Sequence, residues 1–151
     1  MKLNRAAAAV LLVAAAALWA APKQKAAKQF LNPEVGSKPV GYTHVVTSPP
    51  GKMIFISGQG GAIAGKLPPD FSSQAKNTFE NLGRCLKAAG ATFNDVVKVN
   101  YYVTDMANTT ELRRIRAQYL NQSAPPASTL VQVGLGHGSL VEIEMIAIVP
   151  E

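Results

Sequence analysis

The sequence contains few of the residues that build disulfides and metal sites. Cys85 is its only cysteine, so no intramolecular disulfide can form, and stability must come from packing or assembly. The two histidines, His44 and His137, lie far apart, and no HxxH, HxxE or CxxC spacing is present. A phosphate-binding GxxxxGK pattern followed by Ser or Thr is also missing. These absences argue against a metal enzyme and against a P-loop protein.

Charged residues are also sparse, at 16% of the chain, although the formal net charge is +6. Most of the excess of basic residues lies before residue 39, and the chain from Pro39 onward contains 9 basic and 8 acidic residues. A nucleic-acid-binding face needs basic side chains clustered with aromatic ones. Arg113, Arg114 and Arg116 form the only cluster, which is typical of a solvated helix face. We therefore expect no nucleic-acid partner.

The first 20 residues have the layout of a secretory signal peptide. A short basic head, Met1 to Arg5, precedes an unbroken apolar run from Ala6 to Trp19, and small residues follow at Ala20 and Ala21. This run of 14 residues is shorter than the roughly 20 that span a bilayer, which argues against a retained membrane anchor. We expect cleavage after Ala20 and export to the periplasm or the medium, with no membrane association afterwards. The polar, proline-bearing residues 21–38 are interpreted as a tether.

Residues 39–151 form the expected folded domain, with elements in the order β-β-α-β-α-β-β. Strands are expected near residues 40–46, 53–57, 96–103, 127–133 and 141–149, and helices over about 71–89 and 109–120. Asp70 is a suitable N-cap for the first helix, and Gly90 is suitably placed to end it. Two helices can cover only one face of a mixed sheet of about five strands, so the pattern predicts an α+β layer fold. The second face, with Val96, Tyr102, Ile146 and Ile148, is expected to be buried against sister subunits.

The last strand carries two carboxylates on one face. Because side chains at i and i+2 of a strand point the same way, Glu142 and Glu144 project together, roughly 7 Å apart. Val141, Ile143 and Met145 take the opposite face and are expected in the core. On this evidence alone, the carboxylates either face water or line a site.

Ser57 begins a glycine-rich segment directly after a strand, in Ser57-Gly-Gln-Gly-Gly61. We interpret this segment as a tight turn that exposes Ser57 and backbone amides to a cleft. An acyl-transfer nucleophile at Ser57 would need a base, and no motif positions His44 or His137 for that role.

Five motifs together resemble the RidA (YjgF) family, whose members also carry the older label of L-PSP endoribonuclease. They are Gly41-Tyr-Thr-His44, Ile56-Ser-Gly-Gln59, Val97 to Met106, Pro126-Ala-Ser-Thr129 and Val141 to Ala147. The resemblance covers about residues 39–149. It implies a chorismate-mutase-like fold and a homotrimer with small-molecule clefts between subunits. It also implies hydrolysis of 2-imino or 2-enamino acids to 2-oxo acids and ammonia without a cofactor.

The same resemblance assigns site residues in this sequence. Glu142 matches the water-activating glutamate, Tyr42 the cleft tyrosine, Ser57 the cleft serine, and Gly58 shapes the turn beside it. Asn100 contacts either substrate or other groups on the second sheet face.

One position departs from the family pattern. The deaminating members carry an arginine after Pro-Ala, where its planar fork binds the substrate carboxylate, and this chain has Ser128. Losing that bidentate anchor is expected to cost ~2–4 kcal/mol. An arginine that reaches the cleft from the neighbouring subunit would compensate, and the candidates are Arg84, Arg113, Arg114 and Arg116.

Two functions therefore remain open from the sequence. The first is an imine or enamine deaminase whose substrate lacks a carboxylate or holds it differently. The second is a trimer of the same fold that binds a small molecule without turning it over. Ribonuclease activity is disfavoured, because the folded part is nearly neutral and has no histidine pair or carboxylate–metal cluster.

Overall fold

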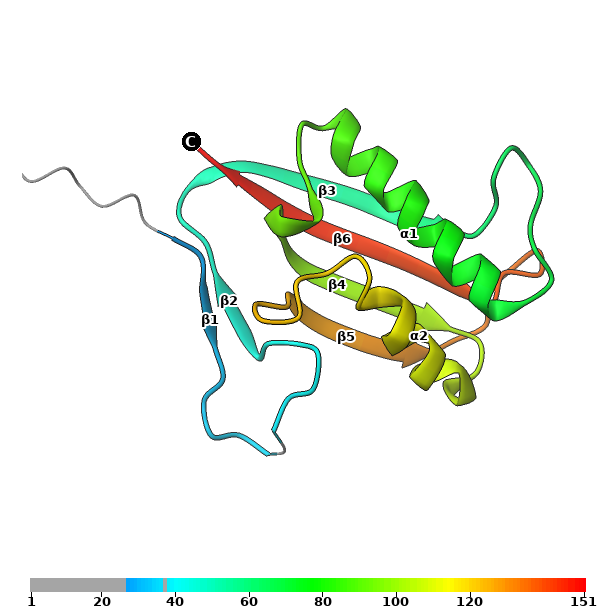
Figure 1. Cartoon of the computed structure of the whole chain (residues 1–151), viewed down its shortest axis with the longest axis horizontal. Coiled ribbons are helices and arrows are strands. Elements are labelled where there is room, and N and C mark those ends of the chain that lie inside the picture. Colours follow the sequence, from blue (N-terminus) through cyan, green and yellow to red (C-terminus); the bar gives the residue numbers. More distant parts are fainter. Residues whose placement is uncertain (1–26, 37) are drawn as a thin grey trace, which may run out of the picture.

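The computed structural model of the chain describes residues 27–36 and 38–151, arranged as a twisted sheet with helices on one side (Figure 1). The predicted signal peptide, residues 21–26 and position 37 of the predicted tether lie outside the described residues. The elements are β1 (Gln29–Leu31), β2 (Val45–Thr47), β3 (Gly51–Gly60), α1 (Phe71–Ala88), β4 (Val96–Val103), α2 (Thr109–Arg116), β5 (Ala127–Gln132) and β6 (Val141–Pro150). Short 3-10 helices at Phe93–Asp95 and Met106–Asn108 precede β4 and α2.

The main sheet has four strands in the order β3-β6-β4-β5. β6 is antiparallel to both β3 and β4, whereas β4 and β5 are parallel, so the sheet is mixed as predicted. The alternation expected for β6 is confirmed: Val141, Ile143 and Met145 are buried, while Glu142 and Glu144 are half-buried on the other face.

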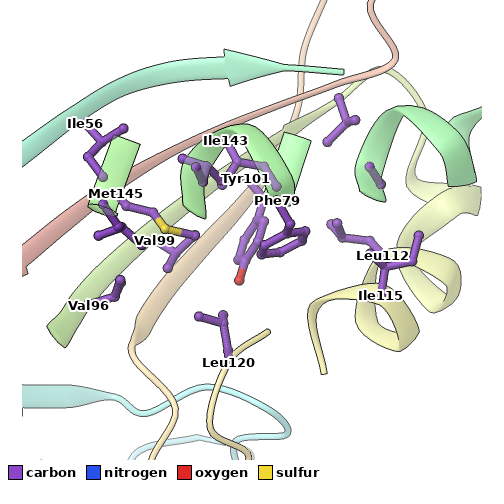
Figure 2. Packing of buried hydrophobic residues seen from close by; sticks show 14 of the residues in the cluster. Ile56, Phe79, Val96, Val99, Tyr101, Leu112, Ile115, Leu120, Ile143 and Met145 are labelled. Carbon is purple, nitrogen blue, oxygen red and sulfur yellow. The ribbon is translucent and has the colours of Figure 1, made fainter. Parts of the chain in front are cut away.

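Both helices pack on the same face of this sheet. Asp70 caps α1 by accepting a hydrogen bond from the Ser73 amide at 2.8 Å, and Gly90 follows the helix with φ 75°, as the sequence predicted. The hydrophobic core lies between the buried side chains of α1, such as Phe79 and Leu82, and the buried faces of β4 and β6. Figure 2 shows Phe79 of α1 beside Tyr101 of β4, with Leu112 and Ile115 of α2 nearby.

Four details differ from the sequence prediction. β1 lies inside the predicted tether and pairs with β2, so β1 and β2 form a separate two-stranded sheet. The residues before Gly51 therefore join two sheets instead of closing a hairpin. A register shift between Val96 and Lys98 turns Val96 into the core, where 3% of it is exposed, instead of onto the second face. The second helix ends at Arg116, short of the predicted Leu120.

The second face of the sheet is uncovered in a single chain. Phe55 and Met53 of β3 are 72% and 54% exposed there, and Ile146 and Ile148 of β6 are half-buried. No helix among the described residues has the length and apolar content to cross a membrane.

Candidate functional site

The two carboxylates of β6 lie in different environments. Glu144 Oε1 accepts hydrogen bonds from Asn100 Nδ2 at 2.6 Å and from the Tyr102 hydroxyl at 3.0 Å. The bond to Glu144 raises the pKa of Tyr102. Within the part of the chain that the structure describes, the Glu142 carboxylate accepts no comparable bond. Glu144 is thus fixed by its neighbours, and Glu142 is available to a water molecule or a ligand.

Glu142 lies directly over the backbone of Gly58. A Cβ atom at Gly58 would overlap the Glu142 carboxylate, with its Cδ atom only 2.7 Å away. The glycine stands in a β-bulge, because the register of β3 against β6 shifts between Ile56 and Gln59. The sequence predicted a turn here, whereas the segment remains inside β3. The bulge places Ser57 and Gly58 together beside the carboxylates, as bulges near functional sites commonly do.

A cavity of about 240 Å³ opens on the same face of the sheet. Ser57, Asn100 and Glu144 line it, together with Lys98. Lys98 Nζ donates to Thr129 Oγ1 at 2.6 Å, and burial lowers the pKa of Lys98. Two of the site residues proposed from the sequence, Ser57 and Asn100, are therefore neighbours here. Asn100 donates to Glu144 across the second sheet face, which is one of its two predicted alternatives.

Tyr42 and Ser128 lie elsewhere, at the edge of the sheet beside α2. They line a pocket of about 250 Å³ with Tyr101, Arg113 and Arg116. Ser128 Oγ donates to the Pro126 carbonyl at 3.2 Å. Since Tyr101 belongs to the helix-covered side, this pocket and the Glu142 carboxylate lie on different sides of the sheet. One chain alone does not bring all the predicted site residues together.

The four candidate arginines are separated by the fold. Arg114 forms a bidentate pair with Glu111, with both N···O distances at 2.7 Å, and Arg84 donates to Asn81. Arg116 and Arg113 line the Ser128 pocket. The sequence left Arg116 as one of four candidates, and no local pattern links it to Gly41, whose backbone lies against its guanidinium in the structure.

Two further features bear on the chemistry. No group of three His, Cys, Asp or Glu side chains suited to a metal ion occurs in residues 27–36 and 38–151. A larger pocket, about 740 Å³, lies along the β1–β2 hairpin and includes Tyr42 as its single predicted site residue. The Glu142 carboxylate lines none of these pockets and lies against Gly58, next to Ser57 of the 240 Å³ cavity. We place the site at the two smaller pockets, because Ser57 and Asn100 line one and Tyr42 and Ser128 line the other.

The fold and the carboxylate-bearing strand define an α+β protein of the RidA type. The family model described as Endoribonuclease L-PSP matches residues 36–149. The chain therefore belongs to the RidA family, as its sequence motifs indicated.

Individual relatives agree with this assignment. The chain is 39% identical over 100 residues to a mouse (Mus musculus) protein named 2-iminobutanoate/2-iminopropanoate deaminase, covering 64% of this chain and 74% of that one. A crystal structure of the Rid-family protein YyfB from Yersinia pestis superposes with a TM-score of 0.69 at 30% identity, covering 81% of this chain and 98% of that one. The crystal structure of RidA from the Antarctic bacterium Psychrobacter sp. PAMC 21119 superposes with a TM-score of 0.63 at 32% identity, covering 80% of this chain and 98% of that one.

Proposed function

We propose that this protein is an imine or enamine deaminase that hydrolyses its substrate to a carbonyl compound and ammonia. The observation that carries the proposal is the contrast between the two carboxylates of β6. Glu144 is occupied by Asn100 and Tyr102, whereas Glu142 lies free over the Gly58 backbone on an open sheet face. A carboxylate held in place without a partner is suited to general-base catalysis. The name of the mouse relative supports the same reaction class.

The chemistry needs only water and a proton carrier. Glu142 takes a proton from water as the water oxygen attacks the imine carbon, giving a tetrahedral carbinolamine. The protonated Glu142 returns this proton to the nitrogen. It then takes the remaining hydroxyl proton of the carbinolamine and passes it to the same nitrogen, so the C–N bond breaks and ammonia leaves as the carbonyl forms. Water supplies both the oxygen and the protons, so the step balances without a cofactor.

We further propose that the complete site forms between copies of the chain in a homotrimer. Glu142, Ser57 and Gly58 lie on the second face of the sheet, and Tyr42 and Ser128 lie at the edge beside α2. A neighbouring copy would bring its edge pocket to this face. The exposed Phe55 and Met53 supply apolar surface for such a contact.

The substrate is proposed to be altered or held differently because of Ser128. A serine hydroxyl bears no charge, and this one already donates to the Pro126 carbonyl. We also propose that the protein acts outside the cytoplasm, on the evidence of the signal-like residues 1–20.

The test is ammonia release from freshly generated 2-iminopropanoate and 2-iminobutanoate. Wild type is compared with Glu142→Gln, with Ser128→Arg, and with Glu80→Gln as a control on α1, outside both pockets of the proposed site. Turnover that disappears in Glu142→Gln and persists in the control supports the deaminase. Turnover that survives Glu142→Gln rejects the role of that carboxylate.

The second candidate is a binding trimer without catalysis, and Ser128 is the observation that favours it. The absence of ammonia release from both wild type and Ser128→Arg would support this alternative. If wild type releases no ammonia but Ser128→Arg does, the Glu142 carboxylate can catalyse the reaction and the natural substrate is a different one.

A further inference from the structure

The pocket beside α2 holds a buried positive charge with no negative partner. Arg116 is 9% exposed, and its Nη2 donates to the Val40 carbonyl at 3.1 Å. Among the described residues, no carboxylate lies within ion-pair distance of it. A guanidinium has five N–H donors, so most of them remain free in this pocket. A buried charge without a partner is costly, which makes the pocket a site for an anion.

An independent polar group points to the same place. Tyr101 lines this pocket and is only 1% exposed. Its hydroxyl lies near the side chains of Arg116 and Ser128, which partly offset the effect of burial on its pKa, but it makes no hydrogen bond of ordinary geometry within the described residues. In Figure 2 the hydroxyl oxygen of Tyr101 projects away from the strand that carries it. Burial raises the pKa of Tyr101 to about 12, so it is a neutral donor at physiological pH. An unsatisfied buried hydroxyl is uncommon and is explained if a ligand oxygen accepts its hydrogen.

The backbone leaves space for the guanidinium. Gly41 has φ 69°, and a Cβ atom there would overlap the Arg116 side chain, with Cζ at 3.1 Å. The Arg116 guanidinium also lies over the Tyr101 ring, 5.9 Å from its centroid. Glycine at position 41 therefore permits both the left-handed turn and the approach of Arg116 to the pocket. The small side chain of Ser128 lines the same space.

We propose that Arg116 and Tyr101 form a carboxylate-binding subsite that replaces the arginine missing at Ser128. The guanidinium would hold the two carboxylate oxygens, and the Tyr101 hydroxyl would donate to one of them. The exposed Arg113 at the rim would add attraction for an anion. The inference rests on the proposed deaminase function and deepens it: the substrate is a short imino acid with its carboxylate intact. A pocket of about 250 Å³ holds a carboxylate with a side chain of a few carbons.

The test measures binding separately from turnover. Calorimetric titration compares 2-oxobutanoate with its neutral amide, 2-oxobutanamide, on wild type and on Arg116→Leu. The expected result is a loss of acid affinity by about tenfold to a hundredfold in Arg116→Leu, with affinity for the amide little changed. Arg114→Leu is the matched control, because Arg114 lies on the same helix, pairs with Glu111 and is outside the pocket. Equal acid affinity in wild type and Arg116→Leu would overturn the proposal.

Tyr101→Phe provides a second test that does not depend on how well Arg116→Leu folds. If the Tyr101 hydroxyl forms its hydrogen bond only with a bound ligand, its removal leaves the melting temperature of the free protein unchanged or higher. It also weakens the binding of 2-oxobutanoate severalfold. A lower melting temperature with unchanged acid affinity would show that the hydroxyl serves the fold, and the subsite would be rejected.

Glu142→Gln separates the two proposals. Acid binding that depends on Arg116, in a protein that never releases ammonia, would overturn the deaminase and keep the subsite. Turnover that needs Glu142 and ignores Arg116 would keep the deaminase and overturn the subsite.

Discussion

The backbone of Gly58 and the carboxylate of Glu142 are in direct contact, across a bulge in β3 that places two residues opposite one of β6. This contact leaves no room for a side chain at position 58. It also limits where the Glu142 carboxylate can lie, because the peptide of Gly58 forms the surface beneath it. The proposed site therefore includes Gly58 as well as Glu142.

We predict that Gly58→Ala lowers ammonia release by at least about tenfold while the protein remains folded. A methyl group would displace the Glu142 carboxylate, and small misplacements of a catalytic group cost large factors in rate. Steady-state kinetics and circular dichroism of the variant check this. Gly134→Ala is the control, since a Cβ there meets no atom within 4 Å. Full activity in Gly58→Ala would show that the contact does not position the base.

Asn100→Asp should make stability depend on pH near neutrality. The new carboxylate would lie within hydrogen-bond distance of Glu144, where Asn100 Nδ2 now lies 2.6 Å from Oε1. Two adjacent carboxylates raise the pKa of one of them. A raised pKa in the folded state means that stability is present at low pH and falls as pH rises through that pKa. Melting temperatures across the pH range should show this fall, and Asn121→Asp at an exposed position should not.

Gln74 joins three segments of the chain, so we predict that Gln74→Leu costs roughly 3 kcal/mol of unfolding free energy. Its amide donates to the carbonyls of Pro68 and Gly138 at 2.8 and 3.1 Å and accepts from the Leu140 amide at 2.8 Å. Leucine would leave these partly buried backbone groups without their partner. Thr78→Val, one turn along α1, removes a single bond to the Gln74 carbonyl and should cost about 1 kcal/mol. Urea denaturation measures the unfolding free energy of both variants. Equal losses of unfolding free energy in Gln74→Leu and Thr78→Val would contradict the prediction.

Local patterns were enough to predict much of this fold. The alternation of β6 and the capped helix between Asp70 and Gly90 follow from short-range rules, and the structure confirms both. The bulges at Val96 and at Ser57 are different, because they are register shifts against partner strands far away in sequence. β1 was also missed, since a three-residue strand in a polar segment is specified mainly by its partner β2.

The same distinction applies to the site. The carboxylate pair on β6 was visible from its spacing of two residues. Choosing Arg116 among four arginines required the position of α2 against β5 and the space left by Gly41, neither of which is encoded in local spacing.

The Glu111 carboxylate of α2 pairs with Arg114 on its own helix and accepts a hydrogen bond from Ser72 of α1, so its removal should change acid stability. The hydrogen bonds from Arg114 at 2.7 Å and, to a smaller extent, from Ser72 at 2.6 Å lower the pKa of Glu111 to about 2. A lowered pKa means that the contribution to stability is present above the unfolded pKa of roughly 4.3 and is lost as pH falls toward 2. Melting temperatures of Glu111→Gln should therefore fall less than those of wild type across this window. The difference should shrink at high salt, because the pair is exposed.

Phe55→Glu should convert the proposed trimer to monomers without unfolding the chain. Phe55 is 72% exposed within one chain, so its replacement leaves the monomer core intact. In a trimer it would place a charge in an apolar interface, which costs several kcal/mol per copy if no partner neutralises it. Light scattering after gel filtration gives the mass, and Lys76→Glu on the exposed side of α1 is the charge control. Because Glu142 and the Ser128 pocket lie on different sides of the sheet, the monomeric variant should also lose ammonia release. A monomer that retains full activity would show that one chain holds the complete site.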